Sequence, residues 1–442
     1  MDPQLAELAA KVAALEKSSA MANTINIEVY YFWATALMVI IHAGFLAYEM
    51  GASRAKNVLA TGIKNILAFG FIVPTFYFFG WWIYLAFPNG FMPSADGDAG
   101  LPWAMAMGPN LSDNATGVFW AAFTLFAATT ASIFSGAVIE RIKMTGFVIL
   151  AILLGSVVWI LGAAWGWHPT GWLTVQWGYH DFGCAGIVHL IAASFAVGVL
   201  LNLGPRIGKF NADGTANDLA AHNVPMILIG LMLIIVGFFG FLAACVIMVG
   251  GDQWTNIYGQ PITLSAIAFN TLMAFAGGII GAWALTRDPF WMMSGGLAGI
   301  IAAAAGLDFY YPPLAFLIGC FAGGTISYVH SLVLKLKIDD AVGAFAVHGW
   351  SGIVSLVACG IFCSGYPNVG DMPPVTFTGQ MVGLIVCLAL GFIPGYVVSL
   401  FLKVARLLRV PDEAQLMGLD LAKVPVKAYP EGHNSLALHP AE

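Results

Sequence analysis

The chain has 442 residues, of which 60% are hydrophobic and only 9% are charged. Soluble globular chains carry about 25% charged residues, so this composition excludes a soluble protein and indicates one that crosses a membrane many times. The mean hydropathy of +0.84 supports that expectation. The net charge of −6 comes without any basic patch, which excludes nucleic acid as a partner.

The first residues, "MDPQLAELAAKVAALEKSSA" (1–20), are polar and favour a helix. Leu5, Leu8, Val12 and Leu15 recur at spacings of three and four residues, which is typical of one apolar helix face. Two interpretations stay open. The segment is either a frayed amphipathic helix or part of a small bundle with copies of itself in an oligomer.

A membrane-spanning helix needs about 20 mostly apolar residues. The sequence contains eleven such stretches, so we expect an all-α polytopic membrane protein with eleven transmembrane helices. The stretches cover roughly residues 27–50, 57–86, 115–139, 145–165, 182–204, 222–250, 262–285, 289–306, 312–335, 340–364 and 375–404.

Basic residues concentrate in alternate links between these stretches and in the tail that follows them. The links are "SRAKN" (53–57), "ERIKM" (140–144), "GPRIGKF" (204–210), "TRDP" (286–289) and "KLKIDD" (335–340). Basic links remain in the cytoplasm, so we expect the N-terminus outside and the C-terminus inside. The chain then divides into an extracytoplasmic amphipathic segment (1–26), a membrane domain (27–404) and a cytoplasmic tail (405–442).

All six cysteines lie in apolar stretches, where they are expected to be small buried side chains without disulfide bonds. They are Cys184, Cys245, Cys320, Cys359, Cys363 and Cys387. The sequence shows no nucleophile–base pair, metal-ligand cluster or phosphate-binding loop. We therefore expect no enzyme activity, no cofactor and no metal.

Two of the stretches carry the same polar pattern. "DFGCAGIVHL" begins at Asp181 and "DAVGAFAVHG" begins at Asp340, and in each a histidine follows the aspartate by eight residues, at His189 and His348. The words "GFLA" in the first and sixth stretches, and "SGAV" and "SGGL" in the third and eighth, repeat in the same order. The first five stretches therefore match the next five.

Five spans is an odd number, so the second repeat enters the membrane from the opposite side. We expect an inverted 5+5 repeat followed by a final long helix, with the functional site near the midplane between the halves. Eight helical residues rise about 12 Å, which places both histidines near the midplane. Asp181 then lies at the outer mouth and Asp340 at the inner mouth, each capping a helix N-terminus.

An ionisable side chain within a membrane span indicates a functional site. Like charge and desolvation both oppose the charging of two adjacent imidazoles. A neutral pair joined by an N–H···N bond is suited to accept and pass on one proton. His189 and His348 therefore predict a small substrate that itself carries a proton.

These residues resemble the ammonium transporter family, the Amt/Mep/Rh proteins, over roughly residues 27–430. The motifs that carry the resemblance are "AGFLAYEMGASRAKN" (43–57), "SGAVIERI" (135–142), "DFGCAGIVH" (181–189), "DDAVGAFAVHG" (339–349) and "GLDL" (418–421). The resemblance implies a homotrimer of eleven-helix protomers in the cell membrane, each with its own narrow pore. It also implies ammonium or ammonia as substrate, with methylammonium as a further one.

The resemblance also implies roles for single residues. His189 and His348 match the twin histidines of the pore, and Phe126 and Phe241 match the stacked phenylalanines that close it from outside. Trp167, with Trp165 as a near-equal alternative, matches the tryptophan of the outer ammonium recruitment site. Cys245 and Asp181 belong to that outer site, while Asp339 and Asp340 are structural residues of the inner mouth.

The sequence departs from the family pattern at several positions. Cys245 replaces the usual serine of the outer site, Leu242 replaces an asparagine, and Gly343 replaces the third aspartate of a "DDxxD" run. The tail reads "GLDLAKVP", where many members read "GLDLxxHGE". These changes imply weaker or altered recruitment and altered regulation.

Three functions remain open. The leading one is ammonium transport after recruitment and deprotonation of the ion at an outer aromatic site. The alternatives are an ammonium sensor that scarcely conducts, as the membrane part of a signalling protein, and a neutral ammonia channel. The resemblance further implies lipid contacts and, at the C-terminal tail, a cytoplasmic nitrogen-signalling regulator or a fused signalling domain.

Overall fold

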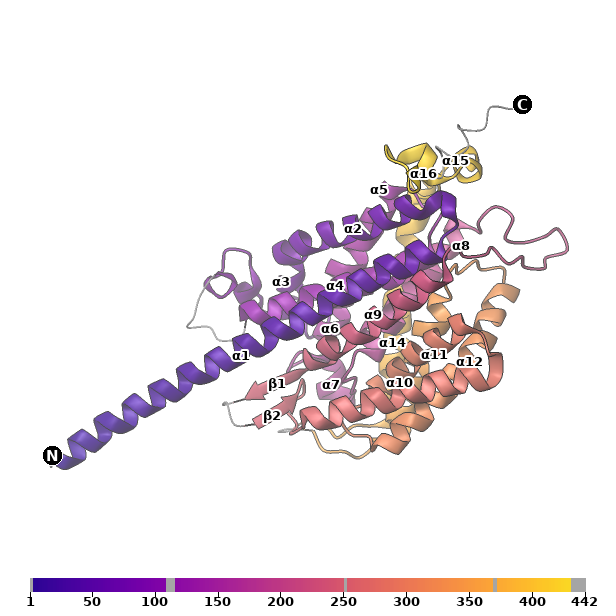
Figure 1. The fold of residues 1–442 in the computed structure, drawn as a ribbon. Coiled ribbons are helices and arrows are strands. Elements are labelled where there is room, and N and C mark those ends of the chain that lie inside the picture. The colour runs from indigo at the N-terminus through magenta and orange to yellow at the C-terminus, as the bar shows by residue number, and fades with distance from the viewer. Residues whose placement is uncertain (1–2, 109–115, 250–252, 369–371, 431–442) are drawn as a thin grey trace.

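The computed structural model describes residues 3–108, 116–249, 253–368 and 372–430. Long helices run side by side through the body of the molecule, and the N-terminal helix projects from one end (Figure 1). The helices that build the membrane body are α1 (Pro3–Ala52), α2 (Val58–Thr75), α3 (Trp81–Ala86), α4 (Thr116–Ala137), α5 (Met144–Leu153), α6 (Trp159–Gly166), α8 (Ile191–Leu203), α9 (Val224–Ala243), α10 (Leu264–Thr286), α11 (Pro289–Ala304), α12 (Pro312–Lys335), α13 (Ser351–Phe362) and α14 (Phe377–Val404).

The remaining elements are short. Four π-helical segments join or precede body helices: η2 (Phe76–Gly80), η5 (Leu154–Val158), η6 (Ala185–Leu190) and η7 (Phe345–Trp350). The links hold the 3-10 turns η1 (Ala55–Asn57), η3 (Ala95–Gly100) and η4 (Met105–Met107), helix α7 (Trp172–Trp177) and the antiparallel strands β1 (Val246–Val249) and β2 (Gln253–Asn256). The tail forms α15 (Asp412–Met417) and α16 (Leu419–Lys423).

The eleven expected spans are confirmed within the described residues. Ten helical segments are long and apolar enough to cross a membrane, and α11 is a shorter apolar helix of 16 residues. Residues 294–304 of α11 are all buried inside the protein. Because protein rather than lipid surrounds α11, its length does not have to match the thickness of the hydrocarbon layer.

The first helices of the two repeats, α1 and α9, pack against each other through small residues. A β-carbon added at Gly44 of α1 would lie 2.7 Å from the carbonyl oxygen of Gly230 on α9. Glycine therefore allows the two backbones to approach closely, which is how helices gain packing energy inside a membrane.

The N-terminal segment continues directly into the first spanning helix. Helix α1 runs without a break from Pro3 to Ala52, across the expected boundary at residue 26. Its residues 3–22 are all exposed, and they extend away from the rest of the molecule (Figure 1).

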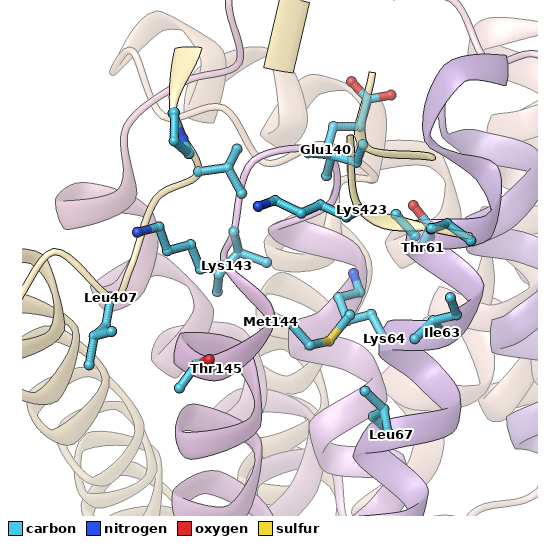
Figure 2. A pocket seen from close by; sticks show the side chains of 16 residues that line it. Thr61, Ile63, Lys64, Leu67, Glu140, Lys143, Met144, Thr145, Leu407 and Lys423 are labelled. Carbon is cyan, nitrogen blue, oxygen red and sulfur yellow. The ribbon is translucent and has the colours of Figure 1, made fainter. Parts of the chain in front are cut away.

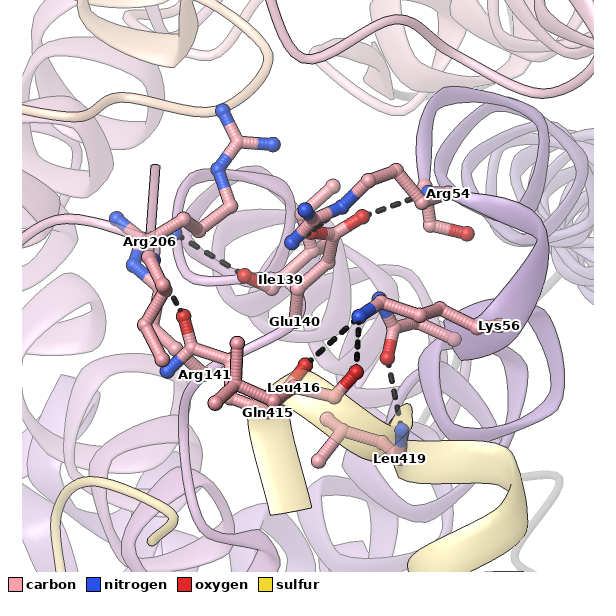
Figure 3. A network of polar contacts seen from close by, with 12 residues as sticks. Arg54, Lys56, Ile139, Glu140, Arg141, Arg206, Gln415, Leu416 and Leu419 are labelled. Atoms are coloured by element: carbon pink, nitrogen blue, oxygen red, sulfur yellow. Dashed lines mark hydrogen bonds and ion pairs between the residues drawn. The ribbon is translucent and has the colours of Figure 1, made fainter. Parts of the chain in front are cut away.

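Four of the five basic links and the start of the tail lie together at the end of the molecule opposite the N-terminus (Figure 1). We call this the basic end (residues 53–57, 138–143, 204–210, 335–340 and 405–424). Lys143 N–H donates to the Leu408 carbonyl at 2.9 Å, and Arg409 donates to the Pro205 carbonyl at 2.8 Å. The ammonium group of Lys56 donates to the Gln415 and Leu416 carbonyls at 3.0 and 2.6 Å (Figure 3). These contacts bring links that lie far apart in the sequence together with the tail at one end of the molecule.

The tail also caps a body helix. The carboxylate of Asp420 accepts the N–H groups of Leu59 at 3.0 Å and Ala60 at 2.8 Å, in the first turn of α2. Asn57 accepts the Leu419 N–H at 2.8 Å (Figure 3). The tail therefore supplies partners for backbone groups that a helix start leaves without any.

Candidate functional site

The two histidines of the repeat meet inside the body. His189 lies in η6 and His348 in η7, and their Nδ1 atoms are 3.1 Å apart. The rings are stacked, with centroids 5.2 Å apart and an interplanar angle of 17°. Both side chains are buried. At this distance one Nδ1 carries the hydrogen and the other accepts it.

Each histidine is positioned by the aspartate eight residues before it. The Asp181 carboxylate accepts N–H groups of Ala185, Gly186 and Ile187 at 2.7–2.9 Å. The Asp340 carboxylate accepts those of Ala344 at 2.9 Å and Phe345 at 2.7 Å. Each aspartate thus caps its helix by accepting the backbone N–H groups four and five residues further along the chain. Because this capping is the same in both repeats, the two histidines have the same orientation relative to their aspartates.

The residues before the two π segments share an unusual backbone. Cys184 has φ = 66° and Gly343 has φ = 73°, both in the left-handed region. These positions are equivalent in the repeat, since each follows its aspartate by three residues. Glycine adopts this conformation at little steric cost. The replacement of the family's usual third aspartate by Gly343 therefore fits the backbone conformation at this position.

Aromatic side chains continue from the histidines. The rings of Phe126 and Phe241 meet edge to face at 4.5 Å and 74°, and Phe241 lies 5.9 Å from His189 between ring centroids. Trp167 packs edge-on against Phe126 at 5.4 Å. We call Trp167, Phe126, Phe241, His189 and His348 the aromatic–histidine line.

A cavity of about 180 Å³ lies at the Trp167 end of this line. Its lining residues are mostly apolar and aromatic: Trp81, Tyr84, Phe119, Phe123, Trp167, Pro169, Ile247 and Ile257. The indole N–H of Trp167 donates to the Asp181 carbonyl at 2.8 Å, which fixes the ring. Trp165 does not line this cavity and packs instead against Phe91 and Trp172.

The other two residues expected at the outer site are buried beside the cavity and do not line it. The Cys245 thiol donates to the Phe241 carbonyl at 3.4 Å, one turn earlier in the chain. The Asp181 carboxylate accepts the Tyr179 hydroxyl at 3.1 Å in addition to its three backbone donors. Its oxygens are therefore used to hold the fold.

A second, much smaller cavity of about 10 Å³ touches His348, with Tyr48, Gly136, Ser294 and Val342 among its lining residues. That volume corresponds to about one water molecule. Most of its lining side chains are apolar, with the Tyr48 hydroxyl, the Ser294 hydroxyl and the His348 ring as the polar groups.

Asp339 and Asp340 lie beside each other but have different partners. Asp339 is held by the backbone N–H and guanidinium of Arg206 at 2.8–2.9 Å, and the Arg141 guanidinium lies 3.8 Å away. Burial raises the pKa of the Asp339 carboxyl, but the charges of Arg141 and Arg206 outweigh burial and hold that pKa well below its usual range. Asp339 therefore joins two links of the basic end as an ion.

Sequence reasoning missed Phe238, whose ring stacks on His189 at 5.7 Å and 12°. Its signal was its position three residues before Phe241, which places both rings on one face of α9. Reasoning from the sequence also missed a buried ion pair between Glu49 and Lys64, 3.1 Å apart. The sequence feature that could have revealed this ion pair is the presence of two residues of opposite charge within apolar stretches.

Lys64 also borders a cavity of about 520 Å³ between α2, α5 and the tail. Thr61, Glu140, Lys143 and Lys423 surround the same space (Figure 2). Burial raises the pKa of Glu140, but hydrogen bonds and charge from Arg54 together with the charge of Arg206 lower it overall. The cavity at the basic end is therefore bordered by charges of both signs.

Comparison with known proteins identifies the family of this chain. A model of the Ammonium Transporter Family matches residues 29–429. The ammonium transporter Amt1 of Methanocaldococcus jannaschii is 31% identical over 416 residues, which cover 92% of this chain and 98% of that protein. The ammonium transporter Amt2 of Archaeoglobus fulgidus is also 31% identical and covers 92% of this chain and 89% of that protein.

Solved structures show the same fold. A Sensor Amt Protein superposes with a TM-score of 0.78 at 26% identity, covering 91% of this chain and 99% of that one. Mep2 of Saccharomyces cerevisiae superposes with a TM-score of 0.73 at 21% identity, covering 88% of each chain. With the family match over most of its length, the chain belongs to the ammonium transporter family.

Proposed function

We propose that this chain carries ammonium or ammonia across the cell membrane along the aromatic–histidine line. The observation that carries the proposal is the 3.1 Å contact between His189 and His348, directly behind the Phe126–Phe241 pair. Ammonium transport itself follows from membership of the family, and the chain is a multi-pass protein of the cell membrane. The route and the steps below are the proposal.

The physical problem is the charge of the substrate. A bare ion in an apolar passage loses its hydration at great cost. In this mechanism ammonium is recruited at the face of Trp167, where a cation–π contact contributes ~0.5–2 kcal/mol. The ion gives its proton to a water molecule at the outer mouth, and ammonia passes Phe126 and Phe241 as a neutral molecule. Potassium has no proton to give and is rejected.

His189 and His348 then receive ammonia and pass on the separated proton. A neutral imidazole pair with one shared hydrogen is suited to both tasks, because it offers a donor and an acceptor without a buried charge. The water-sized cavity that touches His348 leaves room for one small molecule next to that ring. Asp181 and Asp340 act as positioning residues, and Cys245 supports Phe241 from behind.

The oligomeric state and the orientation in the membrane are part of the same proposal. The chain forms a homotrimer surrounded by lipid, with the N-terminus outside and the C-terminus inside. The gathering of basic links and tail at one end supports that orientation. The tail is the contact point for a cytoplasmic nitrogen-signalling regulator or a fused signalling domain.

The test is the current evoked by ammonium in proteoliposomes on a solid-supported membrane, compared with methylammonium and potassium. We expect current with the first two, none with potassium, and its loss in His189→Ala. His42→Ala is the matched control, because His42 is a histidine of α1 outside the line. Absence of current and uptake from well-inserted trimers, or an unchanged His189→Ala variant, would overturn the proposal.

A second candidate is an ammonium sensor, favoured by the similarity to the Sensor Amt Protein. A sensor predicts that ammonium raises the thermal unfolding temperature while uptake and current stay at background. A neutral gas channel predicts ammonia flux without current and without dependence on Trp167. Measuring flux, current and thermal stabilisation on the same preparation separates the three functions.

A further inference from the structure

The N-terminal part of α1 has an apolar face that the other described residues leave exposed. Leu5, Leu8, Val12 and Leu15 have exposed fractions of 59%, 58%, 45% and 69%. They lie on the portion of α1 that extends beyond the body (Figure 1). A single helix in water gains nothing from such a face, because helices in proteins are stabilised chiefly by packing of their apolar side.

The spacing of the four residues is that of a coiled coil. Counted from Leu5, the residues follow one another at intervals of three, four and three. In the heptad notation abcdefg, Leu5 and Val12 therefore occupy position a, and Leu8 and Leu15 occupy position d, of two successive heptads. The positions between them are occupied largely by alanine and charged residues, so the apolar face is a narrow seam. A narrow a/d seam fits another helix better than it fits a membrane surface, which favours a wide apolar face.

The charged residues specify which helix fits. In this heptad frame Lys11 is at a g position and Glu16 is at the following e position. In a parallel coiled coil the g residue of one helix pairs with the next e residue of its neighbour. Two copies of this segment in parallel and in register therefore bring Lys11 of one against Glu16 of the other, in both directions.

The parallel arrangement follows from the membrane. Copies of one chain insert with the same orientation, so all their N-terminal helices leave the bilayer on the same side and point the same way. Residues 5–22 rise about 26 Å along the helix axis. The seam is thus held clear of the described residues of the body, at a place where the helix of a neighbouring copy can run alongside it.

We infer that the N-terminal helices of neighbouring copies of this chain associate as a parallel coiled coil through Leu5, Leu8, Val12 and Leu15. The inference rests on the proposed homo-oligomer, and the number of helices equals the number of copies in it. The coiled coil ties the protomers together outside the bilayer, independently of contacts between their membrane bodies.

Cysteine cross-linking on the full chain in membranes tests the contact. Val12→Cys and Leu15→Cys, at the seam, should form covalent dimers under mild oxidation at least tenfold faster than Ala13→Cys and Ala14→Cys, at the b and c positions on the outer side. Equal rates at all four positions would overturn the inference. Protection of the seam cysteines from a water-soluble maleimide without cross-linking would place the seam on lipid and also overturn it.

Charge exchange tests the register. In the Leu15→Cys background, Lys11→Glu or Glu16→Lys alone should slow cross-linking several-fold, and the two together should restore the original rate. The exposed pair of Lys11 with Glu7 in the same helix, at 2.7 Å, is lost in both Lys11→Glu variants alike, so recovery in the double variant reports the contact between helices. No recovery would overturn the parallel register.

Native mass spectrometry of each variant tests the proposed homo-oligomer independently of the coiled coil. A trimeric mass with slow seam cross-linking would overturn the coiled coil alone. A monomeric mass of the unmodified chain would overturn the proposed homo-oligomer and the coiled coil together, while leaving the transport proposal to its own test.

Discussion

Glu49 of α1 and Lys64 of α2 form an ion pair of 3.1 Å in which neither side chain is more than 4% exposed. Ser135 of α4 donates to the same carboxylate at 2.6 Å, and the Asn65 amide donates to it at 3.0 Å. The pair therefore joins three helices of the first repeat. A charge pair in this position is fully hydrogen-bonded, which is the condition under which burial of ions is tolerated.

Removal of one partner should be much more harmful than removal of both. Lys64→Met or Glu49→Gln should each lower the free energy of unfolding by about 3–5 kcal/mol, because the other polar group stays buried without its partner. The double variant Glu49→Leu/Lys64→Met should recover most of that loss. Thermal unfolding in detergent measures the three variants.

The matched control is Asp412→Asn, which removes a 3.8 Å ion pair with Arg409 in which Asp412 is 68% exposed. Exposed pairs of this kind contribute little, so its unfolding temperature should not change. A double variant as unstable as the singles would show that the charges themselves, and not their pairing, hold the helices.

Asp339 predicts a particular pH dependence. Its pKa is held below the usual range by Arg141 and Arg206, so it contributes stability that is complete above the unfolded-state value of about 3.9 and is lost as the pH falls below it. Asp339→Asn should therefore lower the unfolding temperature by a constant amount between pH 7 and about 4, and by less below that.

The measurement is thermal unfolding of the wild type and of Asp339→Asn from pH 7 to 3. The control is Asp218→Asn, at an exposed position of the link between α8 and α9. If the difference between wild type and Asp339→Asn closes already between pH 7 and 5, Asp339 is protonated at those pH values and the ionic description is wrong.

Gly343 should tolerate side chains poorly. Its φ of 73° costs an L-residue about 1 kcal/mol, and a β-carbon there would come within 3.3 Å of His330 and Trp291. Gly343→Ala should therefore destabilise the protein by at least about 1 kcal/mol, whereas Cys184→Gly, at the equivalent position, should cost little. The measurement is the unfolding temperature of each variant. An unchanged unfolding temperature of Gly343→Ala would contradict the prediction.

Trp167 and Trp165 should differ in their effect on substrate affinity. Only Trp167 lines the 180 Å³ cavity, so Trp167→Leu should raise the half-saturating ammonium concentration about 2- to 30-fold, which is a cation–π contribution of ~0.5–2 kcal/mol. Trp165→Leu should leave it unchanged. Concentration dependence of the ammonium-evoked current is the measurement, and equal shifts would show that neither ring binds the ion directly.

Much of the architecture was predictable because membranes impose strict rules. Span lengths and the alternation of basic links identified the eleven helices, and the shared Asp-to-His spacing identified the pair that meets at 3.1 Å. The choice between Trp165 and Trp167 stayed open, because they lie two residues apart at the end of α6, where the sequence does not define which ring faces the outer cavity.

Other features lay outside sequence reasoning for a physical reason. Apolar periodicity shows which face of a helix is buried but not which side chain it meets, so the stacking of Phe238 on His189 was missed. For the same reason, the sequence did not show that Lys64 pairs with Glu49. The uninterrupted helix from Pro3 to Ala52 was missed because its polar first turns ended the hydropathy signal near residue 27.

The contact of Asp420 with the first turn of α2 has a mechanical consequence. The same helix carries Lys64, one to two turns further along, and through it the joint with α1 and α4. A force or a partner that lifts the tail away would therefore pull directly on the start of a spanning helix. The start of α2 is thus bound to the tail, and the same helix is bound through Lys64 to α1, so one helix connects the tail with the buried ion pair.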